Sequence, residues 1–387
     1  MAIDNKDKKV LNVPHLRFPE FTEEWEKCKL GELAVKVGSG STPKGGNAVY
    51  TTSGHCFVRS QNVGMGHLIL NDIAYIDEST HQKQKSTELR TNDVLLNITG
   101  ASIGRTALAT EEINGGNVNQ HVCIIRTNSN VEPSYICDYI QTSKIQKYIQ
   151  SLQTGGSREG LNFEQIRSFP IYIPMVEEQV KISKLLSLIN ERIAIQSKLI
   201  EKLESLIKGL RVSLMQMENG NIVHLGEIAR IYQPQTISST ELTEDGFLVY
   251  GANGIIGKYK QYNHKTEQIC ITCRGNTCGL VNYTKPMSWI TGNAMVINTD
   301  EHQNKVCKRY LYHYLSAYNF NSIISGSGQP QIVRTPLEKL EITLPSIFDQ
   351  EQKAMLLDRI QAKIEISNRV LNLYQEQKQY LLRQMFI

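Results

Sequence analysis

The sequence predicts an α+β fold in which a mixed globular domain followed by a long helix occurs twice. Three observations support this prediction. Short motifs recur in the same order in the two halves, two long stretches carry the apolar spacing of a coiled coil, and short apolar runs alternate with loops rich in Gly, Asn, Thr and Ser. At 387 residues the chain is long enough for two or three domains.

The internal repeat is the strongest of these observations. Leu-Gly-Glu-Leu at 30–33 recurs as Leu-Gly-Glu-Ile at 225–228, and a turn bounded by glycines at 100–104 recurs at 275–279. Further matched pairs are Gly116-Asn117 with Gly292-Asn293, Tyr135 with Tyr310, Tyr139 with Tyr314, Pro174 with Pro345, and Gln179 with Gln350. We interpret the chain as one ancestral unit, a globular part plus a helix, present twice.

Apolar residues spaced alternately three and four apart form the seam of a coiled coil in both long helices. The polar interruptions, Gln196 and Ser367, fall at the same place in the two copies. A helix of roughly 40 residues is roughly 60 Å long. We expect the two seams to face each other, and spacing alone leaves their direction open. The alternative is that each helix packs on its own domain. The seam residues are Leu186, Ile189, Ile193, Ile200, Leu203, Ile207, Leu357, Ile360, Ile364 and Leu371.

A proline precedes each long helix, at Pro174 and at Pro345, and acidic residues follow in both first turns. Each globular part also carries one helical pattern, at 134–151 and at 308–324. These signals predict a first domain at 1–174, a first spacer helix at 175–218, a second domain at 219–345 and a second spacer helix at 346–387.

The composition excludes some classes of protein and names no partner. A net charge of +4 is weak evidence for a nucleic-acid partner. No apolar run approaches the roughly 20 residues that a membrane span needs, and the polar N-terminus does not resemble a secretory signal. Eight scattered cysteines are too sparse for a disulfide scaffold, so we expect a reducing cytoplasm.

Motifs for catalysis or cofactor binding are not found. No two prolines are adjacent, which excludes the Asn/Asp-Pro-Pro-aromatic motif of amino-methyltransferases, and there is no Gly-x-Gly-x-x-Gly. The stretch from Gly251 to Lys258 resembles a phosphate loop but is one residue too long, and Tyr259 replaces the Ser/Thr that would hold magnesium.

A zinc site at Cys270, Cys273 and Cys278, with His264 nearby, is the alternative that the cysteines suggest. On a strand, residues three apart point to opposite faces, and the repeat places apolar residues at the equivalent positions. We therefore expect these cysteines to fill core space and predict no metal site. For His55 and His121 the sequence identifies no partner.

The residues that carry a family resemblance lie along almost the whole chain. They are Pro-His-Leu-Arg-Phe-Pro-Glu-Phe at 14–21, Trp25, Lys-Leu-Gly-Glu-Leu at 29–33, Thr42-Pro43, Gly100 and Gly104, Pro174 ahead of Glu178-Gln179, and Tyr-Leu-Leu-Arg-Gln-Met-Phe at 380–386. Their order, with the doubled layout, resembles the specificity subunits of type I restriction–modification systems. The second half departs from the family pattern, because it lacks the Arg-Phe-Pro opening and has Asp349 in place of the expected Glu.

The resemblance implies two target-recognition domains, each reading one half of a bipartite, asymmetric site in double-stranded DNA, separated by an antiparallel coiled coil. It implies a chain without catalytic residues or a cofactor of its own. Two methyltransferase subunits would bring S-adenosylmethionine, and motor-nuclease subunits would join for cleavage that uses ATP and magnesium. It implies no contact with a membrane.

Candidate DNA-binding residues are polar side chains in loop-like segments, because Arg and Lys read guanine, Asn and Gln read adenine, and Lys, Arg, Ser and Thr hold phosphates. For any one of them the alternative is a solvated surface residue. In the first domain they are Lys44, Arg59, Ser60, Gln61, Asn62, Arg105, Asn119, Gln120 and Arg158. In the second they are Gln233, Gln235, Asn253, Lys258, Arg274, Asn276, Gln329, Gln331 and Arg334. We expect Asn117 and Asn293 to be structural, since Gly-Asn is typical of a turn.

A second hypothesis for function stays open. A coiled-coil scaffold or interaction protein without DNA specificity would also have long helices and no catalytic motif. It would not account for two similar domains placed around a spacer.

Overall fold

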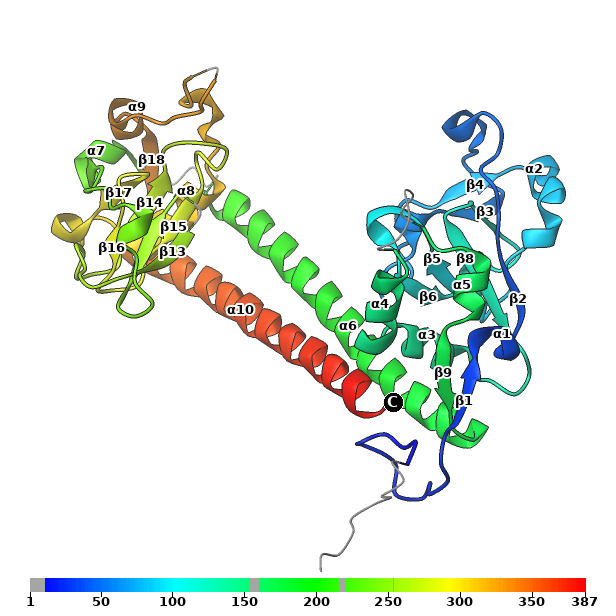
Figure 1. The fold of residues 1–387 in the computed structure, drawn as a ribbon. Coiled ribbons are helices and arrows are strands. Elements are labelled where there is room, and N and C mark those ends of the chain that lie inside the picture. The colour runs from blue at the N-terminus through cyan, green and yellow to red at the C-terminus, as the bar shows by residue number, and fades with distance from the viewer. Residues whose placement is uncertain (1–10, 154–159, 216–219, 253, 327) are drawn as a thin grey trace, which may run out of the picture. The chain divides into compact units, whose positions relative to one another are not determined.

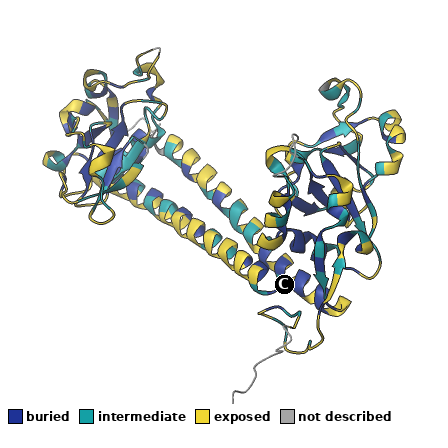
Figure 2. Cartoon of the chain, in the orientation of Figure 1, coloured by how far each residue is buried: buried dark blue, intermediate teal, exposed yellow. Residues whose placement is uncertain are grey.

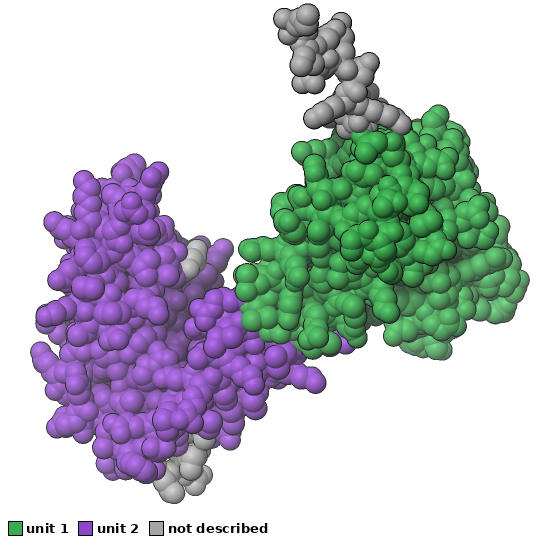
Figure 3. Space-filling view, turned by 90° about the horizontal axis from the view of Figure 1, so that it is seen from below, with its two compact units in different colours: residues 1–196, 370–387 green, residues 197–369 purple. Residues whose placement is uncertain are grey.

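The computed structural model describes residues 11–153, 160–215, 220–252, 254–326 and 328–387 (Figure 1). These residues form two compact units, which Figure 3 colours separately. Unit 1 consists of Met1–Gln196 and Val370–Ile387, and unit 2 of Ser197–Arg369. Each unit therefore contains part of both long helices.

Unit 1 contains a four-stranded sheet in the order β2-β8-β5-β6, a three-stranded sheet in the order β4-β3-β7, and the antiparallel pair β1-β9. Short helices connect and cover these strands (Figure 1). The strands are β1 Glu26–Lys29, β2 Ala34–Ser39, β3 His55–Val58, β4 Ala74–Ile76, β5 Val94–Asn97, β6 Thr106–Leu108, β7 Asn117–Val118, β8 Val122–Thr127 and β9 Pro170–Ile173. The helices are α1 Leu30–Leu33, α2 Glu78–Lys83, α3 Pro133–Ile140, α4 Ser143–Ser151 and α5 Phe163–Arg167.

Unit 2 repeats this topology strand for strand. Its sheets have the orders β11-β17-β14-β15, β13-β12-β16 and β10-β18, and each neighbour relationship matches one in unit 1. The strands are β10 Asn221–His224, β11 Arg230–Tyr232, β12 Phe247–Gly251, β13 Gly254–Tyr259, β14 Ile269–Thr272, β15 Val281–Tyr283, β16 Trp289–Ile290, β17 Ala294–Asn298 and β18 Glu341–Leu344. The helices are α7 Leu225–Ile228, α8 Lys308–Ala317 and α9 Arg334–Glu338. The predicted duplication and mixed α+β class are confirmed.

Strand register corrects one of the matched pairs. Phe57 pairs with Asn117 in unit 1, and the equivalent pair in unit 2 is Val249 with Trp289. Asn117 therefore corresponds to Trp289, whereas Gly292-Asn293 forms the turn between β16 and β17. The Gly-Asn recurrence is a coincidence of sequence at two different places in the fold.

Each unit has one core cluster between its sheets and helices and another between its two larger sheets, and the central strands are buried along their whole length (Figure 2). In unit 1 the aromatic centre of the core is Trp25, Tyr135, Tyr139 and Phe386. Phe386 comes from the segment that follows the second long helix, so the C-terminal part of the chain completes the first unit.

The two long helices are α6 Val176–Met215 and α10 Ile347–Gln384. In unit 1 the first part of α6 packs with the last part of α10, through Leu186 and Leu381 in one core. In unit 2 the last part of α6 packs with the first part of α10, through Ile207 and Leu357. The pairing is therefore antiparallel. The predicted end of the first helix at 218 lies outside the described residues.

The residues predicted for the seam are all buried or half-buried. Leu357 is fully buried, and the polar interruption Ser367 is also buried in the seam. The buried members are Leu186, Ile189, Ile200, Ile207, Leu357 and Ile364, and the half-buried ones are Ile193, Leu203, Ile360 and Leu371.

Within the described ranges no helix is long and apolar enough to cross a membrane.

The helices predicted inside the two domains are shorter than expected. The stretch 134–151 is divided into α3 and α4 because Thr142 stops one helix and caps the next. Its Oγ1 donates to the carbonyl oxygen of Tyr139 at 2.7 Å and accepts from the Ile145 amide at 3.5 Å. The stretch 308–324 is helical only to Ala317, and a 3₁₀ turn at Phe320–Ser322 follows.

Candidate nucleic-acid interface

Four loops of unit 1 emerge at one edge of its sheets. Asn97 at the end of β5 pairs with Val122 at the start of β8, and Ser39 at the end of β2 pairs with Cys123. β3 and β7 run parallel and end side by side, with Val58 against Val118. The loops that leave this edge are 40–46, 59–72, 98–105 and 119–121, and we call them the first loop cluster.

A chain of hydrogen bonds connects three of these loops. The Thr42 amide donates to Gln120 Oε1 at 2.9 Å, and Gln120 Nε2 donates to His121 Nε2 at 3.0 Å. His121 Nδ1 then lies 2.6 Å from the Thr99 hydroxyl. His121 therefore has polar partners on both sides, which its sequence position did not reveal, and the amide of Gln120 is held in one orientation.

The loop at 59–72 is organised around Asp72. Arg59 donates through Nη2 to the Asp72 carbonyl at 2.6 Å and to its Oδ2 at 3.1 Å, and Gln61 Nε2 donates to the same Oδ2. Asn62 is buried and donates to the carbonyl oxygen of Ile69 at 2.9 Å. One turn thus holds three of the predicted DNA-binding residues in fixed positions.

The equivalent edge of unit 2 carries a second loop cluster. Thr272 at the end of β14 pairs with Ala294 at the start of β17, so the loops after β11 and β14 and the turn before β17 lie together. Gln233 Nε2 donates to the Gly292 carbonyl at 3.1 Å. Arg274 forms an isolated β-bridge with Gln331, which brings the segment before α9 to the same edge.

The structure brings most of the predicted residues to these two edges as exposed side chains. Ser60 is half-buried and Arg59 is largely covered. The exposed residues are Lys44, Gln61, Arg105 and Gln120 in unit 1, and Gln233, Gln235, Arg274, Asn276, Gln329, Gln331 and Arg334 in unit 2. Arg334 donates to Glu338 at 2.6 Å. Arg158 and Asn253 lie outside the described residues.

Three of the predicted positions are corrected. Asn62 and Asn119 are buried, and Asn119 Oδ1 accepts from the His121 amide at 3.0 Å, so both asparagines hold the loop backbone. Lys258 lies on strand β13 rather than in a loop, and it forms an ion pair with Asp245 at 3.6 Å. Loop-like composition in the sequence did not distinguish residues that hold the backbone from residues that are exposed to solvent.

The cysteines of unit 2 pack as the sequence predicts. Cys270 and Cys273 are buried in two different core clusters, and Cys278 packs against the one that contains Cys273. Burial raises the pKa of the Cys270 thiol to about 12 and raises that of Cys273 as well, so both thiols are protonated at neutral pH. Across the residues that the structure describes, no group of three or more His, Cys, Asp or Glu side chains could hold a metal ion.

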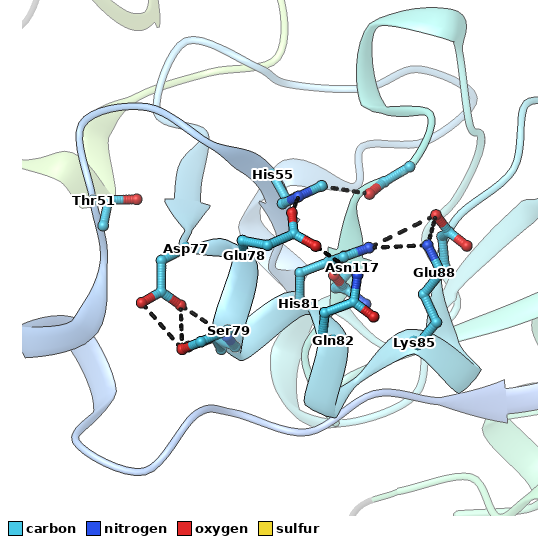
Figure 4. Close-up of polar contacts among 12 residues, drawn as sticks. Thr51, His55, Asp77, Glu78, Ser79, His81, Gln82, Lys85, Glu88 and Asn117 are labelled. Atoms are coloured by element: carbon cyan, nitrogen blue, oxygen red, sulfur yellow. Dashed lines mark hydrogen bonds and ion pairs between the residues drawn. The ribbon is translucent and has the colours of Figure 1, made fainter.

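A histidine pair that the sequence did not reveal holds helix α2 in place (Figure 4). His55 and His81 stack with their ring centroids 3.8 Å apart. His55 contacts Glu78 Oε2 at 2.7 Å, and His81 Nδ1 donates to Asn117 Oδ1 at 2.7 Å. Asn117 is buried, so its predicted structural role is confirmed, although on a strand and not in a turn.

The family model described as "Type I restriction modification DNA specificity domain" matches residues 22–205 and again 217–374. The chain belongs to this family. The two matches coincide with the two copies of the repeat, and together they cover most of the chain.

Similar curated proteins are named as specificity subunits of type I restriction enzymes. The chain is 32% identical over 140 residues to the type I restriction enzyme EcoprrI specificity subunit of Escherichia coli, a match that covers 35% of this chain and 34% of that protein. The first two curated relatives are thus matched over well under half of their length. A longer match, 23% identical over 389 residues, covers 90% of both chains and is to the putative MjaX specificity subunit of Methanocaldococcus jannaschii.

Solved structures support the fold. The S subunit of a type I restriction–modification system from M. genitalium superimposes with a TM-score of 0.70 at 16% identity, covering 97% of this chain and 99% of that one. A chain from a structure on complex assembly of the type I R-M system has a TM-score of 0.53 at 17% identity, covering 94% and 97%. At these identities the likeness concerns the fold alone.

Proposed function

We propose that this chain is the subunit that reads DNA sequence in a type I restriction–modification complex, with each loop cluster reading one half of a bipartite, asymmetric site. The observation that carries the proposal is the repeated edge. Two units with the same strand order each present exposed Arg and Gln side chains on loops at the same edge of their sheets. Such side chains read base edges in the major groove.

The two loop clusters share a scaffold but differ in chemistry. Gln120 is held by Thr42 in unit 1, while Gln233 is held by the Gly292 backbone in unit 2. Two recognition surfaces with different side chains fit two different half-sites. This supports an asymmetric site over a palindromic one.

Partner subunits supply the chemistry in this proposal. Two methyltransferase subunits dock on the chain and bring S-adenosylmethionine, and motor-nuclease subunits bring ATP and magnesium. The modest net charge of +4 fits such an assembly, because partner subunits can provide much of the phosphate contact.

The test uses one exposed arginine from each loop cluster. Arg105→Ala and Arg274→Ala are compared with Arg192→Ala, which changes an exposed arginine on α6 that belongs to neither loop cluster. Each full-length chain is purified with its methyltransferase partner, and methylated sites are mapped on genomic DNA. We expect Arg105→Ala to relax one half-site and Arg274→Ala to relax the other, with Arg192→Ala unchanged.

The results also separate this function from a scaffold without DNA specificity. If the chain is such a scaffold, the complex with the wild-type chain shows no sequence preference in methylation. The three variants then give the same methylation pattern as the wild-type chain. A uniform loss on specific and random DNA would make the arginine concerned a phosphate contact.

A further inference from the structure

The carboxylate of Asp72 accepts hydrogen bonds from two polar side chains of the first loop cluster, Gln61 and Arg59. Its Oδ2 accepts from Gln61 Nε2 and from Arg59 Nη2, the latter at 3.1 Å. The Asp72 side chain is itself 79% exposed, so no demand of the core explains its place. An exposed carboxylate on a surface that approaches DNA phosphates weakens the affinity for DNA. Asp72 therefore has a role other than adding affinity.

The carboxylate of Asp72 fixes the orientation of the side-chain amide of Gln61. An ionised carboxylate only accepts hydrogen bonds, so Gln61 must direct Nε2, and not Oε1, toward it. Gln61 is exposed, which leaves its Oε1 acceptor and the second Nε2 hydrogen for another partner. A fixed donor and acceptor side by side match adenine, whose N6 amino group donates and whose N7 accepts.

The same Asp72 also occupies the guanidinium of Arg59, which is therefore not available to other partners. Its guanidinium donates to both the backbone and the carboxylate of Asp72 and lies 5.6 Å from the centre of the Tyr50 ring. Only 18% of its side chain is exposed. Arg59 therefore stiffens the turn that carries Gln61 and is not presented to a phosphate.

We propose that Asp72 is a positioning residue for base recognition, which fixes the amide of Gln61 to read an adenine in the half-site bound by unit 1 and keeps Arg59 from binding phosphates without regard to sequence. The inference rests on the proposed function and deepens it, because it assigns one residue to one class of base.

Two substitutions at Asp72 distinguish this role from simple loop support. In Asp72→Asn the new side-chain amide can donate as well as accept, so the amide of Gln61 can rotate and direct Oε1 toward residue 72. Gln61 Nε2 then presents both of its hydrogens to the DNA, where guanine O6 and N7 are acceptors. Asp72→Ala releases Gln61 and removes the carboxylate from Arg59, which keeps its hydrogen bond to the backbone carbonyl of residue 72. Asp245→Asn is the matched control, since Asp245 also pairs with a basic side chain but lies in unit 2 away from the loop edge.

The full-length chains, with their methyltransferase partner, select sites from a pool of random duplexes, and thermal unfolding checks that each is folded. We expect Asp72→Asn to lose about tenfold in preference for adenine over guanine at one position of one half-site. Asp72→Ala should lose the preference without gaining guanine and bind random duplex more tightly. Asp245→Asn should select the wild-type site.

The outcomes separate two failures. If the wild-type chain selects two half-sites and Asp72→Asn selects the same ones, the role of Asp72 is refuted while the proposed function stands. If the wild-type chain selects no sequence, the proposed function fails and this inference fails with it. Equal weakening of both half-sites by Asp72→Asn would also refute a role confined to unit 1.

Discussion

Arg211 on α6 donates through Nε to Nδ1 of His313 on α8, with the two nitrogens 3.2 Å apart. Because Nδ1 accepts from a guanidinium, the ring hydrogen must sit on Nε2, which donates to Asp358 Oδ1 on α10 at 2.8 Å. His313 is fully buried, so three helices of unit 2 meet at one neutral imidazole.

Acid should loosen unit 2 through His313. Burial, helped by Arg211 and opposed by the hydrogen bond to Asp358, lowers the pKa of His313 below its ordinary value of 6.5. As the pH falls below about 6.5, His313 is protonated in the unfolded chain before it is protonated in the folded one. The free energy of unfolding of unit 2 therefore decreases. We expect hydrogen exchange in α8 to speed up between about pH 8 and pH 5, corrected for intrinsic rates, and His313→Gln to reduce this effect. The same acceleration in His313→Gln would contradict the assignment.

Unit 1 should respond to pH in the opposite sense, through Asp138. Burial raises the pKa of Asp138 from 3.8 to about 7, although Lys378 and a hydrogen bond from Gln141 oppose it. Between these values the folded state holds a proton that the unfolded chain has released, so stability falls as the pH rises from about 4 to about 7. Exchange in α3 should therefore be slower at about pH 5 than at pH 8, and Asp138→Asn should remove that dependence. An unchanged dependence in the variant would count against it.

Removing the carboxylate of Asp358 should destabilise unit 2 selectively. Arg309 donates to both of its oxygens, and the Arg309 guanidinium lies 4.2 Å from the centre of the Tyr283 ring. Without the carboxylate, Arg309 and His313 lose their partner in a partly buried place. We expect Asp358→Ala to lower the free energy of unfolding by about 2 kcal/mol, measured by denaturant titration. Glu351→Ala, an exposed acid on the same helix, is the control. Similar losses in both variants would refute a specific role for the network.

Lengthening the paired helices should lengthen the spacer of the recognised DNA site. The units divide α6 after Gln196 and α10 after Arg369, so four residues inserted at each place add one turn between them. The added length is about 6 Å, or about two base pairs. Methylation mapping should show unchanged half-sites separated by a longer spacer. The same insertion in the exposed run 303–305, between β17 and α8, is the control. An unchanged site would refute the idea that the helices act as a ruler.

Much of the architecture could be predicted from local patterns. The seam from Leu186 to Ile207 could be predicted because apolar spacing of three and four residues, kept up over that length, favours a coiled coil over a helix packed on its own domain. The repeat was visible because short motifs kept their order. Helix ends were less predictable, since Thr142 fits a helical pattern and is also a good cap.

The rest of the fold and site depends on contacts between distant residues. Gln61 and Asn62 are neighbours with the same kind of side chain, yet one is exposed and the other is buried, because the chain folds back at Ile69 and Asp72. His55 and His81 are separated by a whole strand and stack only because α2 returns to β3. No local pattern signals such a return.

The shared core of Tyr139 and Phe386 sets an order of assembly. The carbonyl oxygen of Ile387 accepts from the Tyr139 hydroxyl at 3.0 Å, and the segment Val370–Ile387 belongs to unit 1. During synthesis, the domain that leaves the ribosome first must wait with an uncovered aromatic surface until the whole of unit 2 has been translated. A stop directly after Arg369 would therefore damage the N-terminal domain more than the domain next to the break, because unit 2 would be complete and unit 1 would lack Val370–Ile387.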